Sequence, residues 1–434
     1  MPTKTSCSIM LTALLTSFVT SCQVTANLPT SLATTATIQI DRKPASLKVG
    51  LPPKGKLYHG VHPGDSSGEE DVFLTKPSTL YDYEKAVRDK KVDHLPAWVY
   101  FSQEWGYQDG DKTKPMNSHA FPLCAVRRIV DRGQTPFIRL MLRSNTDSAA
   151  AKKLEQRESY FTLKNIIGLQ PNDKEISDRI NGDLRKWGED ARLYGKPIIV
   201  EWGTEANDET FGWNARYNGN EEGAKLFRQT FRHIVKTVEG SDPSRSNITW
   251  VFHVTPGSPG DPEWNHMSAY YPDGTDEDGE DVVDWLGLSI YGAQDEREEG
   301  CEPFSKQLQD ALESRGRGLV TLSNRGKRMN RPIFILEMGT AWNYKGKESE
   351  CRAETWTREA FATLIKFAGA REQQVWGFSW WNENFDGYEQ GKVEMRAQES
   401  GGLSRVLKEY LAKPEIYNAP VLNPIPSPKE PCQD

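Results

Sequence analysis

The sequence lacks the patterns that several common classes of protein require. It has 54 Lys and Arg against 61 Asp and Glu, a formal net charge of −7, and no basic cluster stands out. A nucleic-acid partner is therefore not expected, because phosphate binding requires a basic face. Neither an HExxH stretch nor a closely spaced CxxC pair occurs, so a metalloprotease and a structural zinc site have no support.

Cysteines are few and widely spaced, with six in 434 residues. In an oxidising compartment such residues can pair. Cys301 and Cys351 both lie in polar, loop-like segments, so we expect one disulfide between them. Cys124 lies in an apolar helical segment and is expected to be buried.

The acidic run DGTDEDGEDVVD does not have the spacing of a calcium loop. When Asp276, Asp278 and Gly279 are aligned with the DxDG pattern, the first ligand position is Gly274 and the twelfth is Trp285. We expect a solvated acidic loop here, and neither a metal nor a cofactor for the protein.

The first residues have the pattern of a secretion signal, with Lys4 followed by the apolar stretch SIMLTALLTSFV. The following VTSC resembles the bacterial lipobox, which implies that residues 1–21 are removed and that Cys22 is lipidated. An outer-membrane lipoprotein, at the cell surface or in the periplasm, is the expected form. Secretion after cleavage at Ala26 is the alternative.

Composition divides the remainder into three parts. Residues 22–50 are rich in Thr, Ser and Ala and are expected to be a flexible tether, and residues 51–413 hold the predicted folded domain. Residues 414–434 carry too many prolines for regular structure. We expect a monomer that contacts the membrane only through its lipid.

Eight apolar runs alternate with amphipathic segments over the predicted domain. Nearly continuous apolar runs separated by helices are typical of a parallel sheet covered on its outer face. KLYHGVHPGD lacks the GxGxxG turn that an open nucleotide-binding sheet would normally show. The sequence therefore predicts an α/β fold, a (β/α)8 TIM barrel. The eight runs are KLYHGV, LPAWVYF, TPFIRLML, KPIIVEW, ITWVFHV, VDWLGLSIY, RPIFILE and VWGFSWW.

The segments between the runs have helical periodicity. In NDKEISDRINGDLRKWGEDARLYGKP, apolar residues recur at intervals of three and four from Ile176 to Ala191, and Gly195 ends the predicted helix. A second predicted helix, in EEGAKLFRQTFRHIVKTVEG, ends at Gly240.

Two carboxylates stand where predicted strands end. Glu205 follows the fourth run, in VEWGTEAND, and Glu337 ends the seventh, in RPIFILEMGT. In a barrel the carboxyl ends of the strands surround one mouth, so these side chains can converge there. Retaining glycosidases use two carboxyl groups about 5–5.5 Å apart, one as acid/base and one as nucleophile.

The surrounding motifs resemble glycoside hydrolase family 26. TEANDETFGW is similar to that family's acid/base segment, SAYYPDGTDEDGEDVVDWLGLSIYG to its YYPG…VDWVGIDGY stretch, and RPIFILEMGT to its nucleophile strand. The resemblance implies that Glu205 is the acid/base, Glu337 the nucleophile and Tyr291 the hydrogen-bond donor that keeps the nucleophile ionised. Further candidates for substrate contacts are Arg139, Asn207, Trp213, His253, Trp342, Trp380 and Trp381. Since Trp380 and Trp381 are adjacent on a strand, only one points inward, and Trp381 is favoured.

Two positions depart from the family pattern. Family 26 enzymes generally carry His just before the acid/base and Arg four residues before it, where this chain has Thr204 and Glu201. Arg139 is a candidate replacement cation, and Glu201 is expected to form an ion pair, with Arg139 as the candidate partner. Glu383, in WWNEN, is the next candidate for a catalytic carboxylate.

The resemblance implies a retaining hydrolase that cleaves internal β-linkages of a polysaccharide or oligosaccharide, with mannan as the leading substrate. One alternative is a surface glycan-binding lipoprotein on a non-catalytic barrel. Another is a hydrolase of the cell's own exopolysaccharide.

Overall fold

The computed structural model describes residues 48–64, 78–88, 94–105, 107–108, 111–115, 119–142, 161–170, 174–241, 243, 246–257, 260–272, 281–294, 301–326, 329–386 and 392–420. All of them belong to one compact unit, Ser46–Asp434. The predicted signal, Cys22, most of the tether, the acidic run up to residue 280 and the chain after residue 420 lie outside the described residues.

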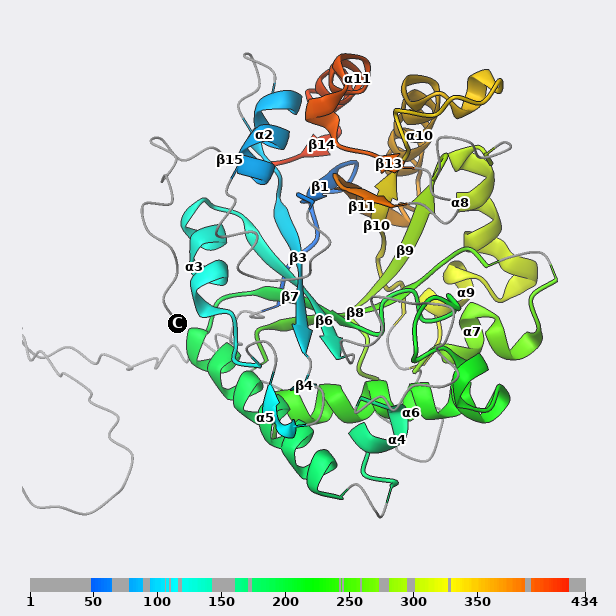
Figure 1. Ribbon diagram of the computed structural model, residues 1–434. Coiled ribbons are helices and arrows are strands. Elements are labelled where there is room, and N and C mark those ends of the chain that lie inside the picture. The colour runs from blue at the N-terminus through cyan, green and yellow to red at the C-terminus, as the bar shows by residue number, and fades with distance from the viewer. Residues whose placement is uncertain are drawn as a thin grey trace, which may run out of the picture. The chain divides into compact units, whose positions relative to one another are not determined.

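Eight parallel strands pair in chain order, and the last pairs with the first, so the sheet closes into a barrel (Figure 1). Each strand contains most of one apolar run, which confirms the predicted (β/α)8 fold. The strands are β1 (Leu57–His62), β3 (Trp98–Trp105), β6 (Thr135–Leu142), β7 (Ile198–Trp202), β8 (Ile248–Val254), β9 (Trp285–Tyr291), β10 (Ile333–Gly339) and β11 (Val375–Trp381).

Helices follow most of the strands and cover the outside of the barrel (Figure 1). They are α2 (Ser78–Val87), α3 (Leu123–Asp131), α4 (Leu163–Ile166), α5 (Lys174–Tyr194), α6 (Glu221–Glu239), α7 (Met267–Tyr270), α8 (Phe304–Glu313), α9 (Leu319–Ser323), α10 (Ala353–Ala368) and α11 (Gly401–Leu411). The periodicity predicted α5 and α6 correctly, because four-residue and three-residue spacing gathers apolar side chains on one face. Among the described residues, no helix is both long and apolar enough to span a bilayer.

The core has two parts because parallel strands bury both faces. Alternate residues such as Tyr100, Phe137 and Ile199 pack inside the barrel. Their neighbours, including Ile138 and Val200, pack against the helices.

The segment before β1 lies at the amino ends of the strands. The Lys48 ammonium lies 2.7 Å from the Asp284 carboxylate, and the Val49 amide donates to the Thr249 hydroxyl at 2.9 Å. Thr249 is the second residue of β8, and Asp284 comes directly before β9. The chain therefore enters the barrel opposite the mouth, the ring formed by the carboxyl ends of the strands.

Four short pairings complete the described sheets. β2 (His94–Leu95) pairs with β15 (Ala419–Pro420), β4 (Tyr107–Gln108) with β5 (Asp111–Pro115), β12 (Asn384–Asp386) with β13 (Lys392–Glu394), and β14 (Ile416–Tyr417) with β1. Residues 414–420 were predicted to lack regular structure, but two short strands form there because their backbone completes sheet edges.

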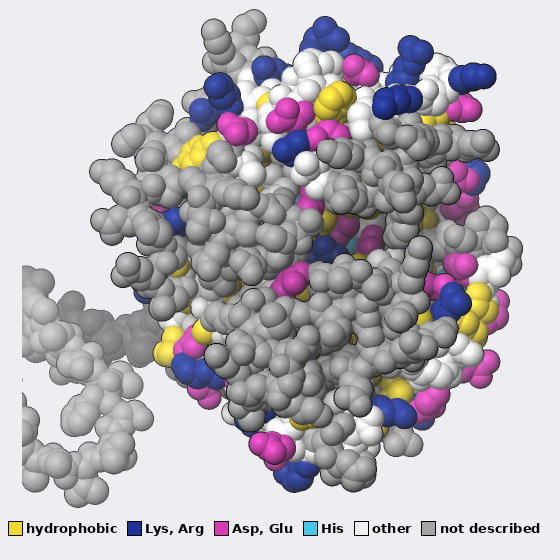
Figure 2. All heavy atoms as spheres, in the orientation of Figure 1, with side chains coloured by type: hydrophobic (Ala, Val, Ile, Leu, Met, Phe, Trp, Pro, Cys, Tyr) yellow, Lys and Arg dark blue, Asp and Glu magenta, His cyan; other side chains and the backbone are white. Residues whose placement is uncertain are grey.

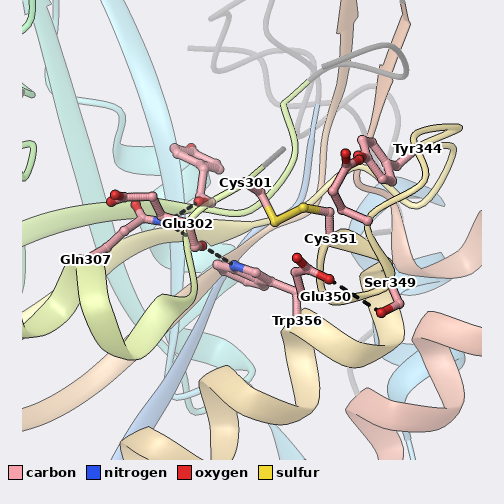
Figure 3. Close-up of a disulfide and its surroundings, with 10 residues drawn as sticks. Cys301, Glu302, Gln307, Tyr344, Ser349, Glu350, Cys351 and Trp356 are labelled. Atoms are coloured by element: carbon pink, nitrogen blue, oxygen red, sulfur yellow. Dashed lines mark hydrogen bonds between the residues drawn. A yellow bond between two sulfur atoms is a disulfide. The ribbon is translucent and has the colours of Figure 1, made fainter. Parts of the chain in front are cut away.

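A disulfide joins Cys301 to Cys351, as the sequence predicted (Figure 3). It links the segment before α8 to the segment before α10, and these segments follow β9 and β10. Nearby, the Gln307 amide donates to the Tyr291 carbonyl at 2.7 Å. Cys124 was expected to be buried, but it is half-buried and is itself disulfide-bonded.

Candidate active site

Glu205 lies in a tight turn immediately after β7. Its φ of 48° is in the left-handed region, and Gly203 before it has a φ of 69°. A residue with a Cβ rarely adopts this conformation unless its surroundings impose it, and such strain is common at functional sites. Here the Trp213 indole donates to the Thr204 carbonyl at 3.0 Å, and the Ala206 amide donates to the His253 carbonyl at 2.9 Å.

Asn207 and Trp213 hold this turn from within. The Asn207 side chain accepts from the Thr255 amide at 2.9 Å and donates to the Thr255 carbonyl at 3.2 Å. Trp213 is buried and stacks on Phe211, with ring centroids 4.7 Å apart. We predicted substrate contacts for both. The structure gives both a supporting role in the turn, because their polar atoms are used by the backbone.

Glu337 is aimed into the barrel by a β-bulge in β10. Its neighbour Leu336 packs in the barrel interior, and the register with β9 shifts between Ile335 and Glu337. A bulge inserts one extra residue and re-aims the side chain that follows. Two consecutive side chains can therefore face inward, and the buried Glu337 reaches the mouth.

Tyr291, at the end of β9, contacts the predicted nucleophile. Its hydroxyl donates to Glu337 Oε2 at 2.7 Å. Burial raises the pKa of Tyr291 well above its usual range, and the charges of Glu337 and Glu205 raise it further. Tyr291 therefore stays a donor, and both carboxyl groups lie close enough to act on it.

Arg139 lies between two carboxylates. Its Nε is 3.7 Å from Glu201 Oε1, and its Nη1 is 3.7 Å from Glu337 Oε1. The expected ion pair between Glu201 and Arg139 is thus present, and the cation also faces Glu337. The Tyr100 hydroxyl donates to Glu201 Oε1 and lies 3.5 Å from Glu337 Oε1.

The two predicted catalytic carboxyl groups have different electrostatic surroundings. Burial raises the pKa of Glu205 to about 8, with further contributions from the charges of Glu337 and Asp208. Glu337 instead faces Arg139 and accepts from Tyr291. A pair of carboxyls in which one is protonated and the other is held as an anion can divide the roles of acid and nucleophile.

His253 is fully buried and links β7 to β9. Its Nδ1 lies 2.9 Å from Glu201 Oε2 and 3.0 Å from the Thr204 hydroxyl, and its Nε2 lies 2.9 Å from the Ser289 hydroxyl. Burial opposes protonation, but the charge of Glu201 and its hydrogen bond outweigh burial and raise the pKa of His253.

The predicted aromatic residues are placed differently from one another. Trp380 is fully buried between the barrel and the helices, so it is not a sugar platform. Trp381 packs in the barrel interior, with one ring face on His62 at a centroid distance of 3.8 Å. Trp342, just after β10, is 36% exposed and is accessible from solvent. Sugar contacts by Trp381 and Trp342 stay predictions.

Glu201, His253 and Glu337 offer ligand atoms that all lie within 4.8 Å of one another. Such a set could hold a metal ion, but each member already has a polar partner. The guanidinium of Arg139 lies 3.7 Å from both carboxylates and supplies positive charge there. We therefore assign these side chains to the ion-pair network.

Three residues at the mouth were not among the predicted site residues: Tyr100, Ser289 and His62. Strand alternation carries a signal for Ser289, which is two residues before Tyr291 and so shares its face. Tyr100 lies on the same face of β3 as Trp98, so in the sequence it looks like a residue of the hydrophobic core. The face of the molecule in Figure 2 is hollowed near its centre, and charged side chains of both signs lie at the base of the hollow.

No protein-family model matches the chain. It is 27% identical to a β-1,3-xylanase of Vibrio sp. over 36% of this chain and 31% of the relative. It is 24% identical to a β-1,3-xylanase of Alcaligenes sp. over 56% of this chain and 48% of the relative. The chain therefore spans less than half the length of these curated relatives.

Solved structures share the fold at low identity. The catalytic domain of a family 26 endo-β-1,4-mannanase of Bacillus sp. JAMB-750 matches with a TM-score of 0.51 and 13% identity, over 85% of this chain and 88% of that one. An endo-β-1,4-mannanase double mutant of Cellulomonas fimi matches with a TM-score of 0.50 and 16% identity, over 84% and 73%.

The two curated relatives described above are named as xylanases and the two solved structures as mannanases, and the solved structures share the barrel fold of this chain. One of these solved structures is named a family 26 enzyme, and this is the family that the motifs of this chain resemble.

Proposed function

We propose that this protein is a retaining glycoside hydrolase that cleaves internal β-linkages of a polysaccharide. The observation that carries the proposal is the pairing at the mouth. Glu205, whose pKa burial raises to about 8, lies close enough to a second carboxylate, Glu337, to interact with its charge, and Glu337 accepts a hydrogen bond from Tyr291 and faces Arg139.

The proposed reaction has two steps. In the first, a Glu337 oxygen attacks the anomeric carbon while Glu205 gives its proton to the leaving oxygen, so the glycosidic bond breaks and a glycosyl ester forms. In the second, ionised Glu205 takes a proton from water. The resulting hydroxyl bonds to the anomeric carbon and Glu337 leaves as a carboxylate. Tyr291 and Arg139 stabilise the Glu337 anion before the first step and after the second.

Two substrate classes are supported by specific observations. The family 26 motifs favour a β-1,4-mannan, which stays the leading candidate. Two of the curated relatives are named β-1,3-xylanases, which makes a β-1,3-xylan the second candidate.

The test is release of reducing ends from soluble mannans, β-1,3-xylan, β-glucans and bacterial exopolysaccharides. We expect release from at least one glycan, and we expect it to disappear in Glu337→Gln. Glu239→Gln is the matched control, since this half-buried carboxylate at the end of α6 hydrogen-bonds Trp250 and lies at the opposite end of the barrel. If nothing is cut but a glycan binds, the chain is a glycan-binding protein.

We also propose that the protein is a monomer on the outer membrane, anchored through Cys22. Metabolic labelling with a fatty-acid probe tests the anchor. The expected result is a label on the intact protein that Cys22→Ser removes, and a secreted, unlabelled chain would contradict it.

A further inference from the structure

Three buried polar side chains near the mouth have no step in the proposed reaction. Glu201 and His253 are fully buried and Ser289 is 2% exposed. They come from β7, β8 and β9, three neighbouring strands. Burying a polar group costs free energy unless it is hydrogen-bonded, so we ask which partners these three side chains have and which way each hydrogen bond points.

The three side chains form one continuous chain of hydrogen bonds. Glu201 Oε2 lies 2.9 Å from His253 Nδ1, and His253 Nε2 lies 2.9 Å from the Ser289 hydroxyl. The Ser289 hydroxyl also lies close enough to Glu205 to act on the pKa of that carboxyl, which it lowers. In the sheet Ser289 is directly opposite Glu337, so it occupies the layer of the two catalytic carboxyls.

The charge on His253 decides which way these hydrogen bonds point. A charged imidazole donates from both nitrogens, to Glu201 at one end and to Ser289 at the other. The Ser289 hydroxyl then accepts from His253, and its own hydrogen is left to point at Glu205. A neutral imidazole with its proton on Nδ1 would instead accept the Ser289 hydrogen and turn it away from Glu205.

We infer that Glu201, His253 and Ser289 form a directed hydrogen-bond chain that positions the acid/base carboxyl of Glu205. Glu201 stabilises the imidazolium, the imidazolium orients Ser289, and Ser289 donates to Glu205 whether that carboxyl is protonated or ionised. These are positioning residues, and the inference rests on the proposed function of Glu205.

The hydrogen-bond chain also accounts for one departure from the family 26 pattern. Thr204 stands where family 26 enzymes carry His, and its hydroxyl lies 3.0 Å from His253 Nδ1. An imidazole is thus supplied beside the acid/base from β8, the neighbouring strand. The His253 carbonyl also accepts from the Ala206 amide, so the same residue holds the Glu205 turn.

Several charged or titratable groups surround Glu205 and influence its pKa. They are Glu337 on β10, Asp208 in its own turn, His253 on β8, Arg139 on β6 and Tyr291 on β9. Removing the Ser289 hydroxyl leaves these charges in place and deletes only a donor to the ionised form. The acid pKa should then rise, because a donor to the charged form lowers it.

The first experiment compares kcat/KM against pH in the whole protein, on whichever glycan it cuts. For Ser289→Ala we expect the alkaline limb of the pH profile, where kcat/KM falls as Glu205 loses its proton, to move to higher pH by about half a pH unit to one pH unit. We also expect kcat to fall by about tenfold. Ser289→Thr, which keeps the hydroxyl, should restore the limb. The matched control is Ser379→Ala, a buried barrel serine whose hydroxyl accepts from Trp98 at 2.7 Å. It should leave the limb unchanged.

The second experiment does not depend on turnover. Carbon-13 NMR titration of the Glu205 carboxyl should show the same upward shift in Ser289→Ala, and nitrogen-15 NMR should show a charged His253 at pH 6.5 that becomes neutral in Glu201→Gln. If the wild-type protein cuts no glycan but these shifts occur, the hydrogen-bond chain stands and the proposed function fails. If it cuts glycan and Ser289→Ala changes neither the limb nor the carboxyl titration, the inference is overturned.

Discussion

Arg139 lies directly across from Glu201 in the register of β6 and β7, with Nε 3.7 Å from Oε1. Family 26 enzymes generally carry Arg at the position of Glu201. In this chain the carboxylate of Glu201 occupies that position on β7, and the cation, Arg139, stands on the neighbouring strand β6. Arg139 lies 3.7 Å from Glu337, so a positive charge stands beside the proposed nucleophile.

Replacing Arg139 should destabilise the protein strongly. Arg139→Met removes the guanidinium that faces the buried carboxylates of Glu201 and Glu337, and breaking a buried ion pair typically costs about 3–5 kcal/mol. The free energy of unfolding in urea measures this. Arg216→Met, which removes an exposed ion pair with Glu209, is the control and should cost less than about 1 kcal/mol. Equal losses in both variants would contradict the role assigned to Arg139.

Removing the Tyr291 hydroxyl should slow the reaction without unfolding the barrel. Tyr291→Phe loses the hydrogen bond to Glu337, and a bond to a charged group is worth about 1.5–3 kcal/mol, so kcat/KM should fall by about ten- to a hundredfold. Tyr83→Phe is the control, since its hydroxyl bonds His59 beside α2. A Tyr291→Phe enzyme with full activity would show that this contact is not used.

The raised pKa of Glu205 predicts how stability changes with pH. Its pKa is about 8 in the folded protein against an ordinary value of 4.5, so between these values the folded state binds the proton more tightly. Stability should therefore fall as pH rises from about 4.5 to 8. Glu205→Gln removes this term, so its unfolding free energy should improve relative to wild type between pH 5.5 and pH 9. A constant difference across that range would contradict the assignment.

Loss of the disulfide should lower stability more than activity. Cys301 and Cys351 are 50 residues apart, and closing a loop of that length is worth about 4 kcal/mol in the chain-entropy account. Urea unfolding of the Cys301→Ser/Cys351→Ser protein should show most of that loss, with kcat at 25 °C nearly kept. A fall in kcat comparable to that of Tyr291→Phe would instead show that the bond positions the loop behind Tyr291.

Much of the fold could be predicted because each strand is an apolar run and each long helix has clear periodicity. Glu205 and Glu337 could be chosen because a carboxylate at the end of a buried strand is costly. Their surroundings were harder to predict. The bulge at Leu336 and the left-handed φ of Glu205 depend on packing between strands, which the sequence does not display.

Contacts between strands and turns account for what the sequence did not predict. Trp213 and Asn207 were predicted to contact substrate because of their motif, and the structure shows that both also hold the turn that presents Glu205. Their substrate contacts stay predictions. Ser289 and Tyr100 were not predicted, because a single polar group within an apolar strand looks like part of the hydrophobic core in the sequence. Only the register between strands shows that they face charged groups.

The most direct test of the account is to trap the covalent intermediate. The protein would be incubated with an activated 2-deoxy-2-fluoro β-glycoside of the sugar that it releases, and its mass then measured. We predict an increase of one fluoroglycosyl group, located by peptide mapping on Glu337 and absent from Glu337→Gln. A fluoroglycosyl label on a residue other than Glu337 would contradict the account. So would an active enzyme that forms no adduct and inverts the configuration of the anomeric carbon.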